Sequence, residues 1–349
     1  MGLDKLVRVL LLHDPVNSNN WGGVQTITQT LQHALHALGF EVVALPWQQT
    51  QFGGLLSAAR NSDILVAAHN FGPTYCGVAL KTLTRKPLVS WVHGPLLDVL
   101  QVSKASWWKR RRLKHVYGYV DRFVCVSQTT EKSLLGFLST SVGRISRTAV
   151  VLNGLAPLAY PEDSLVLNTP IHQTNLSIGY IGRLSEEKRP HFLLETMRCL
   201  PTEAQLCIVG DGDLRPALED AGKDLMANGR LKFLGRQVSS CGLYVPFQVT
   251  MLTSQYEGCP MTALESLACG VPCVALPIPA MRELFAQDAP YLLAHDVTPQ
   301  ALAIAVLNLE QIPLEQVQAD MARIVTKYSL LNFANSWKST LLDLVHASK

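Results

Sequence analysis

Short apolar runs that alternate with helical patterns restrict the fold of this chain more than any other feature. Parallel strands that are buried on both faces have this character, whereas half-exposed strands alternate apolar and polar residues. Helical patterns lie between these runs and would complete βαβ units. One of them extends from about Val24 to Leu38 and ends at Gly39. We therefore predict an α/β fold with parallel strands. The first series of predicted strands is Val7–Leu12, Glu41–Leu45, Ile64–Ala68, Leu88–Val92 and Phe123–Val126.

The strand pattern starts again after a break. Val150–Leu152 precedes a proline-bearing stretch, Leu155–Pro170, which is the best candidate for a linker. A chain of 349 residues exceeds what one hydrophobic core usually holds, so we expect two domains. Two doubly wound domains in series would place a cleft between the carboxyl ends of their sheets, where ligands bind. The second series of predicted strands is Leu176–Ile181, Gln205–Val209, Leu231–Leu234, Val249–Leu252 and Val271–Ala275.

Composition excludes several classes of protein. Hydrophobic residues make up 48% of the chain, but no run of about 18 apolar residues occurs, so we expect no spanning helix. The first five residues lead into a strand pattern without a signal-peptide cleavage site, and we expect a cytoplasmic protein. The net charge of +3 is too small to indicate a nucleic-acid partner.

Eight cysteines occur, and no two have the CxxC spacing of a zinc or redox site. Most lie in apolar runs such as Phe123–Val126. We therefore expect buried, reduced thiols and no disulfide or zinc site.

The segment Tyr256–Pro272 carries the strongest chemical signal. Glu257 and Glu265 lie eight positions apart, and a short predicted helix ends at Gly270. The entry to this helix should leave backbone N–H groups free, which attract phosphate, while a carboxylate nearby can bind sugar hydroxyls. The predicted binding segment at this entry is Gly258, Cys259, Pro260, Met261 and Thr262.

A structural alternative accounts for the same residues. Thr262 and Glu265 have the spacing of a capping box, in which Glu265 would only satisfy a backbone donor. Glu257 could equally be a solvated loop charge.

A second loop supplies cations. Gly182 and Arg183 follow a predicted strand, and Lys188 comes just before Pro190, which we expect in the first turn of a helix. A guanidinium fork and an ammonium suit a departing diphosphate, whose negative charge grows as it leaves. The alternative is a surface loop in which Glu186 and Glu187 pair with these cations.

Two further loops end strands of the first domain. Gly22 and Gly23 would let the backbone approach a phosphate closely, although they could be simple turn glycines. His69 and His93 end two strands, and Gly94-Pro95 would fix the turn after His93, which we therefore favour over His69. A lone histidine is more often structural than catalytic.

A basic segment lies between Asp98 and Asp121 and contains no acidic residue. Trp107, Trp108, Tyr117 and Tyr119 interleave with its cations. Clustered cations and interfacial aromatic residues indicate a surface for anionic lipid or acceptor. The alternative is a solvated helix face with the tryptophans in the core. The cations are Lys104, Lys109, Arg110, Arg111, Arg112 and Lys114.

Taken together, these segments resemble the retaining glycosyltransferases of family 4, which have the GT-B fold of two Rossmann-like doubly wound domains facing across a cleft. The resemblance extends from Gly22 to about Leu284 in the family's order. The matching segments are Gly22–Gln25, Asn153–Gly154, Gly179–Leu184 with Lys188, Val209–Gly212, Phe233–Arg236 and Glu257–Pro272.

The resemblance implies an acceptor domain over residues 1–157, a donor domain over 158–327, and a C-terminal helix over about 328–349 that packs back on the first domain. Arg183 and Lys188 would bind the donor diphosphate, Glu257 the donor sugar, and Glu265 the ribose. Loops around Gly210 and Arg236 would border the base, Gly22 and Gly23 would approach the phosphates and acceptor, and His93 would lie by the sugar.

The resemblance also implies an enzyme that needs no metal and transfers a hexose, with retention, from a nucleotide sugar. UDP is the expected nucleotide, and the acceptor would be a glycan or lipid-linked glycan in surface-glycan synthesis at the inner face of a membrane. Two alternatives stay open: an epimerase of sugar nucleotides, and a non-catalytic partner that binds glycan or membrane.

Overall fold

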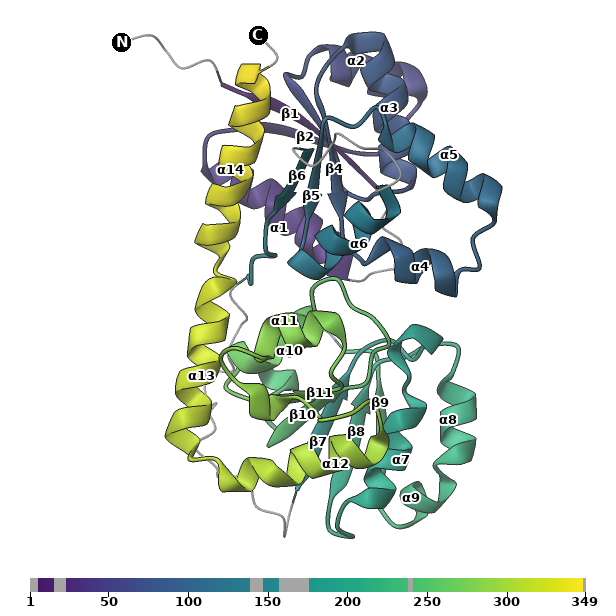
Figure 1. Ribbon diagram of the computed structural model, residues 1–349, viewed down its shortest axis with the longest axis vertical. Coiled ribbons are helices and arrows are strands. Elements are labelled where there is room, and N and C mark those ends of the chain that lie inside the picture. Colours follow the sequence, from purple (N-terminus) through teal and green to yellow (C-terminus); the bar gives the residue numbers. More distant parts are fainter. Residues whose placement is uncertain (1–5, 16–22, 139–146, 157–175, 238–240, 348–349) are drawn as a thin grey trace. The chain divides into compact units, whose positions relative to one another are not determined.

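The computed structural model describes residues 6–15, 23–138, 147–156, 176–237 and 241–347. The chain forms two compact units, each an α/β domain with a parallel sheet (Figure 1). Unit 1 comprises Met1–Ala156 with Tyr328–Lys349, and unit 2 comprises Pro157–Lys327. The predicted fold class is confirmed.

Unit 1 contains a six-stranded sheet in the order β2-β1-β3-β4-β5-β6, all parallel. Every residue of β3 and β4 is buried, because helices cover both faces, and this explains why the runs are apolar throughout. Most predicted bounds are correct within one residue, but β6 begins two residues before the predicted run. The strands are β1 (Arg8–His13), β2 (Glu41–Pro46), β3 (Ile64–Ala67), β4 (Leu88–Val92), β5 (Arg122–Cys125) and β6 (Thr148–Val150).

The helices of unit 1 follow its strands in βαβ order. α1 ends just before Gly39, whose φ of +84° lies in the left-handed region that glycine tolerates best. The helices are α1 (Gly23–Ala37), α2 (Phe52–Arg60), α3 (Gly72–Thr84), α4 (Leu96–Val102), α5 (Trp107–Tyr117) and α6 (Gln128–Leu138).

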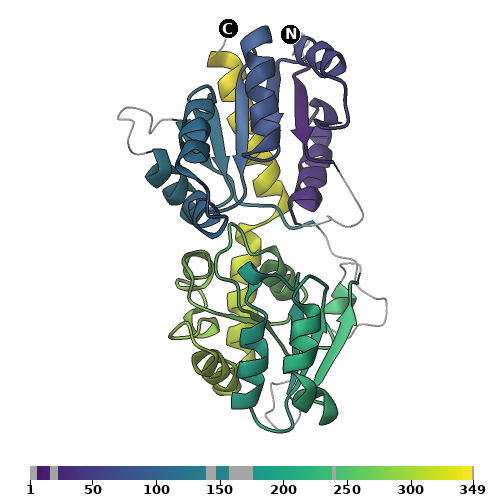
Figure 2. The ribbon, with the colours of Figure 1, turned by 90° about the vertical axis from the view of Figure 1, so that its right-hand side faces the viewer.

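The C-terminal helix α14 (Leu330–Ala347) completes the core of unit 1, and Figure 2 shows it running beside the sheet. Trp337 on α14 is fully buried and meets Trp91 of β4 edge to face, with 4.9 Å between ring centroids. A Cβ on Gly154 would lie 2.8 Å from the Cβ of Phe333, so the chain approaches α14 closely there. The last helix of the chain is therefore part of the first domain.

Unit 2 contains a five-stranded parallel sheet in the order β11-β10-β7-β8-β9. The strands are β7 (Ser177–Ile181), β8 (Gln205–Val209), β9 (Leu231–Gly235), β10 (Val249–Leu252) and β11 (Cys273–Ala275). The α-helices are α7 (His191–Cys199), α8 (Arg215–Ala221), α9 (Lys223–Ala227), α10 (Met261–Ala268), α11 (Pro279–Phe285), α12 (Pro299–Asn308) and α13 (Leu314–Lys327). Short 3₁₀ turns are η4 (Glu186–Lys188), η5 (Cys241–Leu243), η6 (Pro290–Leu292) and η7 (Leu309–Gln311). Pro190 is the cap of α7 and lies one residue before the predicted position.

The prediction that all cysteines are reduced is wrong. Cys241 of η5 and Cys269 at the end of α10 form a disulfide, with 5.4 Å between their Cα atoms. Both are fully buried, in a cluster that also contains Tyr244 and Phe247. They lie 28 residues apart in the sequence, so no short motif marks the pair, and only the fold brings them together. The free cysteines are Cys76, Cys125, Cys199, Cys207, Cys259 and Cys273.

Within the described residues, no helix combines the length and the apolar character that crossing a bilayer requires.

Candidate functional site

The loops that follow β7, β8, β9 and β10 carry most of the predicted site residues of unit 2. Because these strands are parallel, their carboxyl ends share one edge of the sheet, which is where open α/β sheets bind ligands. The fold therefore gathers loops that are far apart in the sequence.

Lys188 and Glu257 meet at this edge. The Lys188 Nζ lies 2.5 Å from Oε1 of Glu257, and the Ser254 hydroxyl donates to the same oxygen at 2.6 Å. The Thr253 hydroxyl donates to the Lys188 carbonyl at 2.7 Å, which ties the loop after β10 to η4. The side chain of Glu257 is only 12% exposed and is hydrogen-bonded to Lys188 and Ser254. It is therefore not a solvated loop charge.

The alternative in which Glu187 pairs with Lys188 is wrong. Glu187 accepts a hydrogen bond from the Ser185 hydroxyl at 2.7 Å, while the Lys188 ammonium lies against Glu257. The sequence could not distinguish these partners, because it does not show which carboxylate lies next to Lys188 in space.

Arg183 follows β7 directly and is exposed. Its carbonyl accepts a hydrogen bond from the Tyr180 hydroxyl at 3.0 Å, which fixes the backbone. Burial, reinforced by Glu257 and Glu187, raises the pKa of Tyr180, so this hydroxyl stays protonated and donates. Among the described residues, the Arg183 guanidinium forms no ion pair, so it can bind an incoming anion.

Glu265 lies on α10 and accepts a hydrogen bond from the Tyr244 hydroxyl at 2.6 Å. Burial and the adjacent Glu265 raise the pKa of Tyr244, so the phenol remains the donor. The capping-box alternative is wrong, because α10 begins at Met261 and its cap, Pro260, has no side-chain oxygen. Sequence reasoning missed Tyr244, since nothing local connects it to α10.

The predicted binding segment forms the entry and first turn of α10. Gly258 and Pro260 are buried, whereas Cys259, Met261 and Thr262 are half-buried. The start of a helix favours an anion, and the binding of phosphate by this segment stays a prediction. Gly270 has a φ of +78° beyond the cap Cys269, in agreement with its predicted role.

Two backbone segments of the edge pack directly on each other. Gly210 has a φ of +142°, and a Cβ there would lie 1.9 Å from the Gly182 carbonyl oxygen. The Gly210 N–H donates to the carbonyl of Gly235 at 2.8 Å, so the loop after β9 joins them. Arg236 follows and is exposed. The edge thus exposes backbone rather than side chains at its centre, as close approach to a ligand requires.

His93 lies at the carboxyl end of β4 in unit 1. Its Nε2 donates to the Ala68 carbonyl at 2.9 Å, because a carbonyl can only accept, and this leaves Nδ1 without a proton. Burial, with the neighbouring His69, lowers the pKa of His93 to about 3. The ring is therefore neutral near pH 7, and it offers one acceptor.

His69 is oriented by Asp14. Its Nδ1 lies 3.5 Å from the Asp14 carboxylate, which also accepts from the Trp47 indole at 2.9 Å. Gly23 is the first residue of α1, and no atom lies within 4 Å of the position that a Cβ would take there. Gly22, the other predicted glycine, lies outside the described residues.

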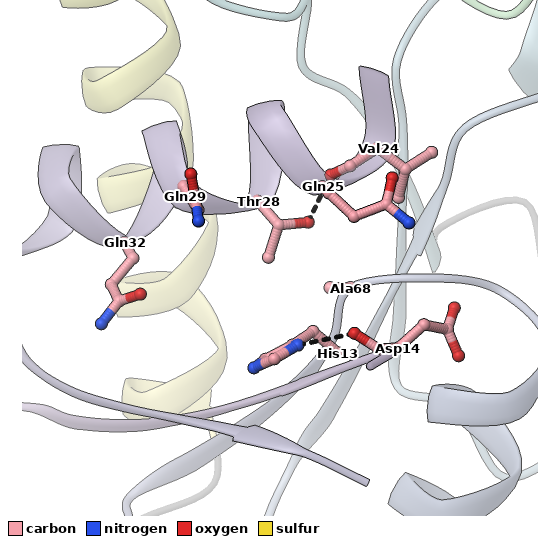
Figure 3. A pocket seen from close by; sticks show the side chains of 8 residues that line it. All are labelled: His13, Asp14, Val24, Gln25, Thr28, Gln29, Gln32 and Ala68. Carbon is pink, nitrogen blue, oxygen red and sulfur yellow. Dashed lines mark hydrogen bonds between the residues drawn. The ribbon is translucent and has the colours of Figure 1, made fainter. Parts of the chain in front are cut away.

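A pocket that sequence reasoning missed lies between α1 and the end of β1, with a cavity volume of about 90 Å³ (Figure 3). In Figure 3, side chains of α1 face His13 and Asp14 across the pocket. Three glutamines with helical spacing were the available signal. The pocket is lined by His13, Asp14, Val24, Gln25, Thr28, Gln29, Gln32 and Ala68.

The basic segment forms α5 and the turn before it. Trp107 and Trp108 are 59% and 71% exposed, so the alternative that places them in the core is wrong. Lys109, Arg111 and Arg112 are also exposed, whereas Arg110 donates to two backbone carbonyls, of Leu100 and Ala105. We call five exposed residues of this helix the α5 surface: Trp107, Trp108, Lys109, Arg111 and Arg112.

In the part of the chain that the structure describes, no three His, Cys, Asp or Glu side chains gather as a metal site would require.

Two sequence families match the chain. Residues 44–155 match the model described as Glycosyltransferase Family 4, and residues 175–311 match that described as Glycosyl transferases group 1.

Curated relatives match over part of their length. An uncharacterized glycosyltransferase of Methanocaldococcus jannaschii is 22% identical over 69% of this chain and 65% of its own. The GDP-mannose-dependent alpha-(1-6)-phosphatidylinositol dimannoside mannosyltransferase of Mycobacterium tuberculosis is 30% identical over 40% of this chain and 37% of its own. The matches thus span less than two thirds of either relative.

Solved structures match over nearly the full chain. Anabaena HepE in complex with UDP and glucose is 18% identical with a TM-score of 0.75, covering 97% of this chain and 100% of HepE. Sucrose-phosphate synthase from Thermosynechococcus elongatus is 17% identical with a TM-score of 0.76, covering 98% and 100%. At these identities the likeness shows the fold, which is that of the GT-B glycosyltransferases.

Proposed function

The chain belongs to the group 1, family 4 glycosyltransferases, and we propose that it transfers a hexose from UDP-hexose to a hydroxyl of a glycan acceptor, with retention of configuration. The observation that carries this proposal is the contact of Lys188 with Glu257 at an edge where Arg183 is exposed and unpaired within the described residues. The two cations, Lys188 and Arg183, suit a diphosphate, and the carboxylate of Glu257 suits the hydroxyl groups of the sugar attached to it.

Each part of the donor has a candidate partner in unit 2. Arg183 and Lys188 bind the diphosphate, Glu257 accepts hydrogen bonds from the sugar, and Glu265 accepts them from the ribose. The Tyr244 hydroxyl holds one oxygen of Glu265, so the carboxylate keeps its orientation when the ribose binds. Gly182, Gly210 and Arg236 border the diphosphate and base.

The reaction breaks the bond between the anomeric carbon and a diphosphate oxygen, which keeps the electron pair. Arg183 and Lys188 stabilise the negative charge as it grows on that oxygen. The acceptor hydroxyl bonds to the anomeric carbon from the same face, and its proton passes to the departing phosphate. Because the diphosphate takes the proton, no metal and no protein base are needed in this scheme.

His93 acts as a hydrogen-bond acceptor and not as an acid. Its Nε2–H is held by Ala68, and the low pKa keeps Nδ1 unprotonated at neutral pH. Such an atom can receive a hydrogen bond from a sugar hydroxyl, which is the role that we propose for His93.

Nucleotide binding is the first test. The HepE structure contains UDP, whereas the mycobacterial relative is named for GDP-mannose. UDP and GDP are therefore the two nucleotides to be compared. We expect UDP at 100 times its Kd to stabilise the native state by about 2.7 kcal/mol, measured as a thermal shift. A shift with GDP alone would refute UDP, and no shift with any nucleoside diphosphate would refute the transferase.

The role of Arg183 is tested by kinetics. Replacing Arg183 with Ala should lower kcat by roughly 100-fold or more, because one preorganised donor to a developing charge is lost. The KM for acceptor should change little. Arg198→Ala is the matched control, since Arg198 pairs with Asp224 on the exposed face of α7. Equal kcat values for both variants would exclude the leaving-group role.

We further propose that the α5 surface binds an anionic membrane surface and places the enzyme near lipid-linked glycans. Two exposed tryptophans suit the headgroup region, and each cation close to anionic lipid contributes about 1 kcal/mol. Among the residues that the structure describes, Lys109, Arg111 and Arg112 form no ion pair with an acidic side chain.

Flotation with vesicles tests this surface. The vesicles chosen for the experiment contain about 30 mol% phosphatidylglycerol. The chain should float with these vesicles but not with vesicles of pure phosphatidylcholine. Exchanging Trp107 and Trp108 for Ala, or Lys109, Arg111 and Arg112 for Gln, should abolish flotation, while the control Lys223→Gln should not. Undiminished flotation of both sets would reject the surface.

A further inference from the structure

Two adjacent hydroxyl groups after β10 reach different parts of the proposed donor site. Thr253 and Ser254 follow Leu252, the last residue of β10, and their exposed fractions are 0% and 2%. Hydroxyl groups that are buried this deeply are almost always hydrogen-bonded within the protein. Here the Ser254 hydroxyl bonds to the side chain of Glu257, and the Thr253 hydroxyl bonds to the backbone of Lys188.

The Ser254 hydroxyl occupies one oxygen of the Glu257 carboxylate. This hydroxyl and the Lys188 ammonium donate to the same atom, Oε1, at 2.6 Å and 2.5 Å. Within the described ranges of the chain, no hydrogen bond reaches the second oxygen, Oε2. Because each carboxylate oxygen can accept, the protein uses one side of the carboxylate and leaves the other for a hydroxyl group of a ligand.

The two donors to Oε1 differ in how firmly they are held. Lys188 has a long, flexible side chain that is 27% exposed, and we propose above that it also binds the diphosphate. Ser254 is buried, and a single staggered torsion places its hydroxyl oxygen. When the Lys188 ammonium turns toward a diphosphate, the Ser254 hydroxyl remains as the donor that keeps Glu257 in place.

Thr253 acts on the backbone of Lys188. Its hydroxyl donates to the Lys188 carbonyl at 2.7 Å, and the Gln255 N–H donates to the Glu187 carbonyl at 2.8 Å. The next residue, Arg189, has a φ of +46°, in the left-handed region that is unfavourable for residues other than glycine. Such a conformation persists only where the surroundings impose it. The two hydrogen bonds join η4 to the loop after β10, and they therefore fix the backbone that carries the Lys188 side chain.

From these contacts we propose that Ser254 and Thr253 are positioning residues for two different parts of the donor. Ser254 orients Glu257 toward the sugar, and Thr253 fixes Lys188 for the diphosphate. The inference rests on the proposed function, because it takes Glu257 to bind the sugar and Lys188 to bind the diphosphate. Hydroxyl groups that only tied the loops together would instead affect the binding of the whole donor, each to the same degree for UDP and for UDP-sugar.

Calorimetry with UDP and with UDP-glucose, on the full chain, separates the two roles. Ser254→Ala should weaken the binding of UDP-glucose roughly tenfold or more, as expected for the loss of one hydrogen bond to a charged group. The same variant should change the Kd for UDP by less than about twofold, because UDP lacks the sugar. Thr253→Val should weaken the binding of both ligands by the same factor, roughly fivefold, because both contain the diphosphate.

Matched controls remove buried hydroxyl groups elsewhere. Ser62→Ala removes a hydroxyl that donates to the Ala58 carbonyl in unit 1, and Thr196→Val removes one that donates to the Phe192 carbonyl within α7. Neither control should change the Kd for either ligand by more than about twofold. Thermal unfolding shows whether each variant is folded. If Ser254→Ala is not folded, Ser254→Cys takes its place, and it should show a smaller loss of the same kind, because a thiol is a weaker donor.

The wild type tests the proposed function, and the variants test the inference. A loss for UDP-glucose alone in Ser254→Ala, with equal losses for both ligands in Thr253→Val, supports the two roles. If the wild type binds both ligands and the variants show any other pattern, the inference is overturned and the transferase stands. If the wild type binds GDP instead, GDP and GDP-mannose replace the two probes and the same differences are expected. If it binds no nucleoside diphosphate, the transferase and the inference fail together.

Discussion

Individual residues matter most where the backbone leaves no room. Gly210 combines a φ of +142° with a Cβ position 1.9 Å from the Gly182 oxygen, so no side chain fits without moving both loops. Lys188, Glu257, Tyr244 and Glu265, by contrast, are held by side-chain hydrogen bonds and can be exchanged without rebuilding the backbone.

Replacing Gly210 with Ala should destabilise unit 2 by about 3 kcal/mol or more, since overpacking and backbone strain add. Gly53→Ala is the control, because Gly53 lies in helix α2 with open space around it, and the change should be neutral or stabilise by up to about 1 kcal/mol. Urea denaturation measures both. A Gly210 variant as stable as the wild type would contradict the packing of the two loops.

His93 makes stability depend on pH. Its pKa is lowered to about 3 in the folded state, so between pH 3 and 6.5 the unfolded chain binds a proton that the folded chain does not. The contribution of His93 to the unfolding free energy is therefore complete above pH 6.5. It is lost as the pH falls toward 3, by up to about 1.4 kcal/mol per pH unit. His93→Asn should flatten the pH profile of the unfolding free energy. The exposed His346→Asn should leave it unchanged, and identical profiles for the two variants would contradict the assignment.

Among the elements, α10 depends on distant partners for its position. It has eight residues and no side-chain cap, which is short for a stable isolated helix. Tyr244 holds Glu265 in its middle, and the disulfide from Cys241 holds its end at Cys269. The segment from Cys241 to Tyr244 therefore positions α10, the helix that carries Glu265, the carboxylate proposed to bind ribose.

The disulfide gives a chemical and a thermodynamic prediction. Thiol titration of the denatured, unreduced chain should find six thiols, because only Cys241 and Cys269 are bonded. Reduction should cost about 3.6 kcal/mol of unfolding free energy, as expected for closing a loop of 28 residues. The exposed Cys199→Ser should leave stability unchanged. Eight thiols in the unreduced chain would contradict the bond.

At the scale of the whole molecule, unit 1 is built from two separate segments of the chain and unit 2 from one. Residues from both ends build unit 1, whereas unit 2 is continuous. The cluster of Trp91, Phe333 and Trp337 joins β4 to α14, and all three rings are buried. The stability of unit 1 therefore depends on the last residues of the chain.

Trp337→Ala should destabilise unit 1 by about 3–5 kcal/mol, because it removes a fully buried aromatic side chain. Lys338→Ala is the control, since Lys338 is its exposed neighbour on α14. The residues proposed to bind UDP belong to unit 2, so calorimetry should show a change in Kd for UDP of less than about twofold. A parallel loss of UDP affinity would show that the two units fold together.

The sequence determined the strands and the loops that carry function. Strands such as Leu88–Val92 are predictable because a sheet covered on both faces must be apolar, and loops after parallel strands must share one edge. Only the tertiary structure decided the partners. Lys188 could pair with near or distant carboxylates, Cys241 has no local partner, and the tryptophans of α5 could lie inside or outside. These choices depend on which surfaces meet at long sequence separation, and local patterns carry no information about that.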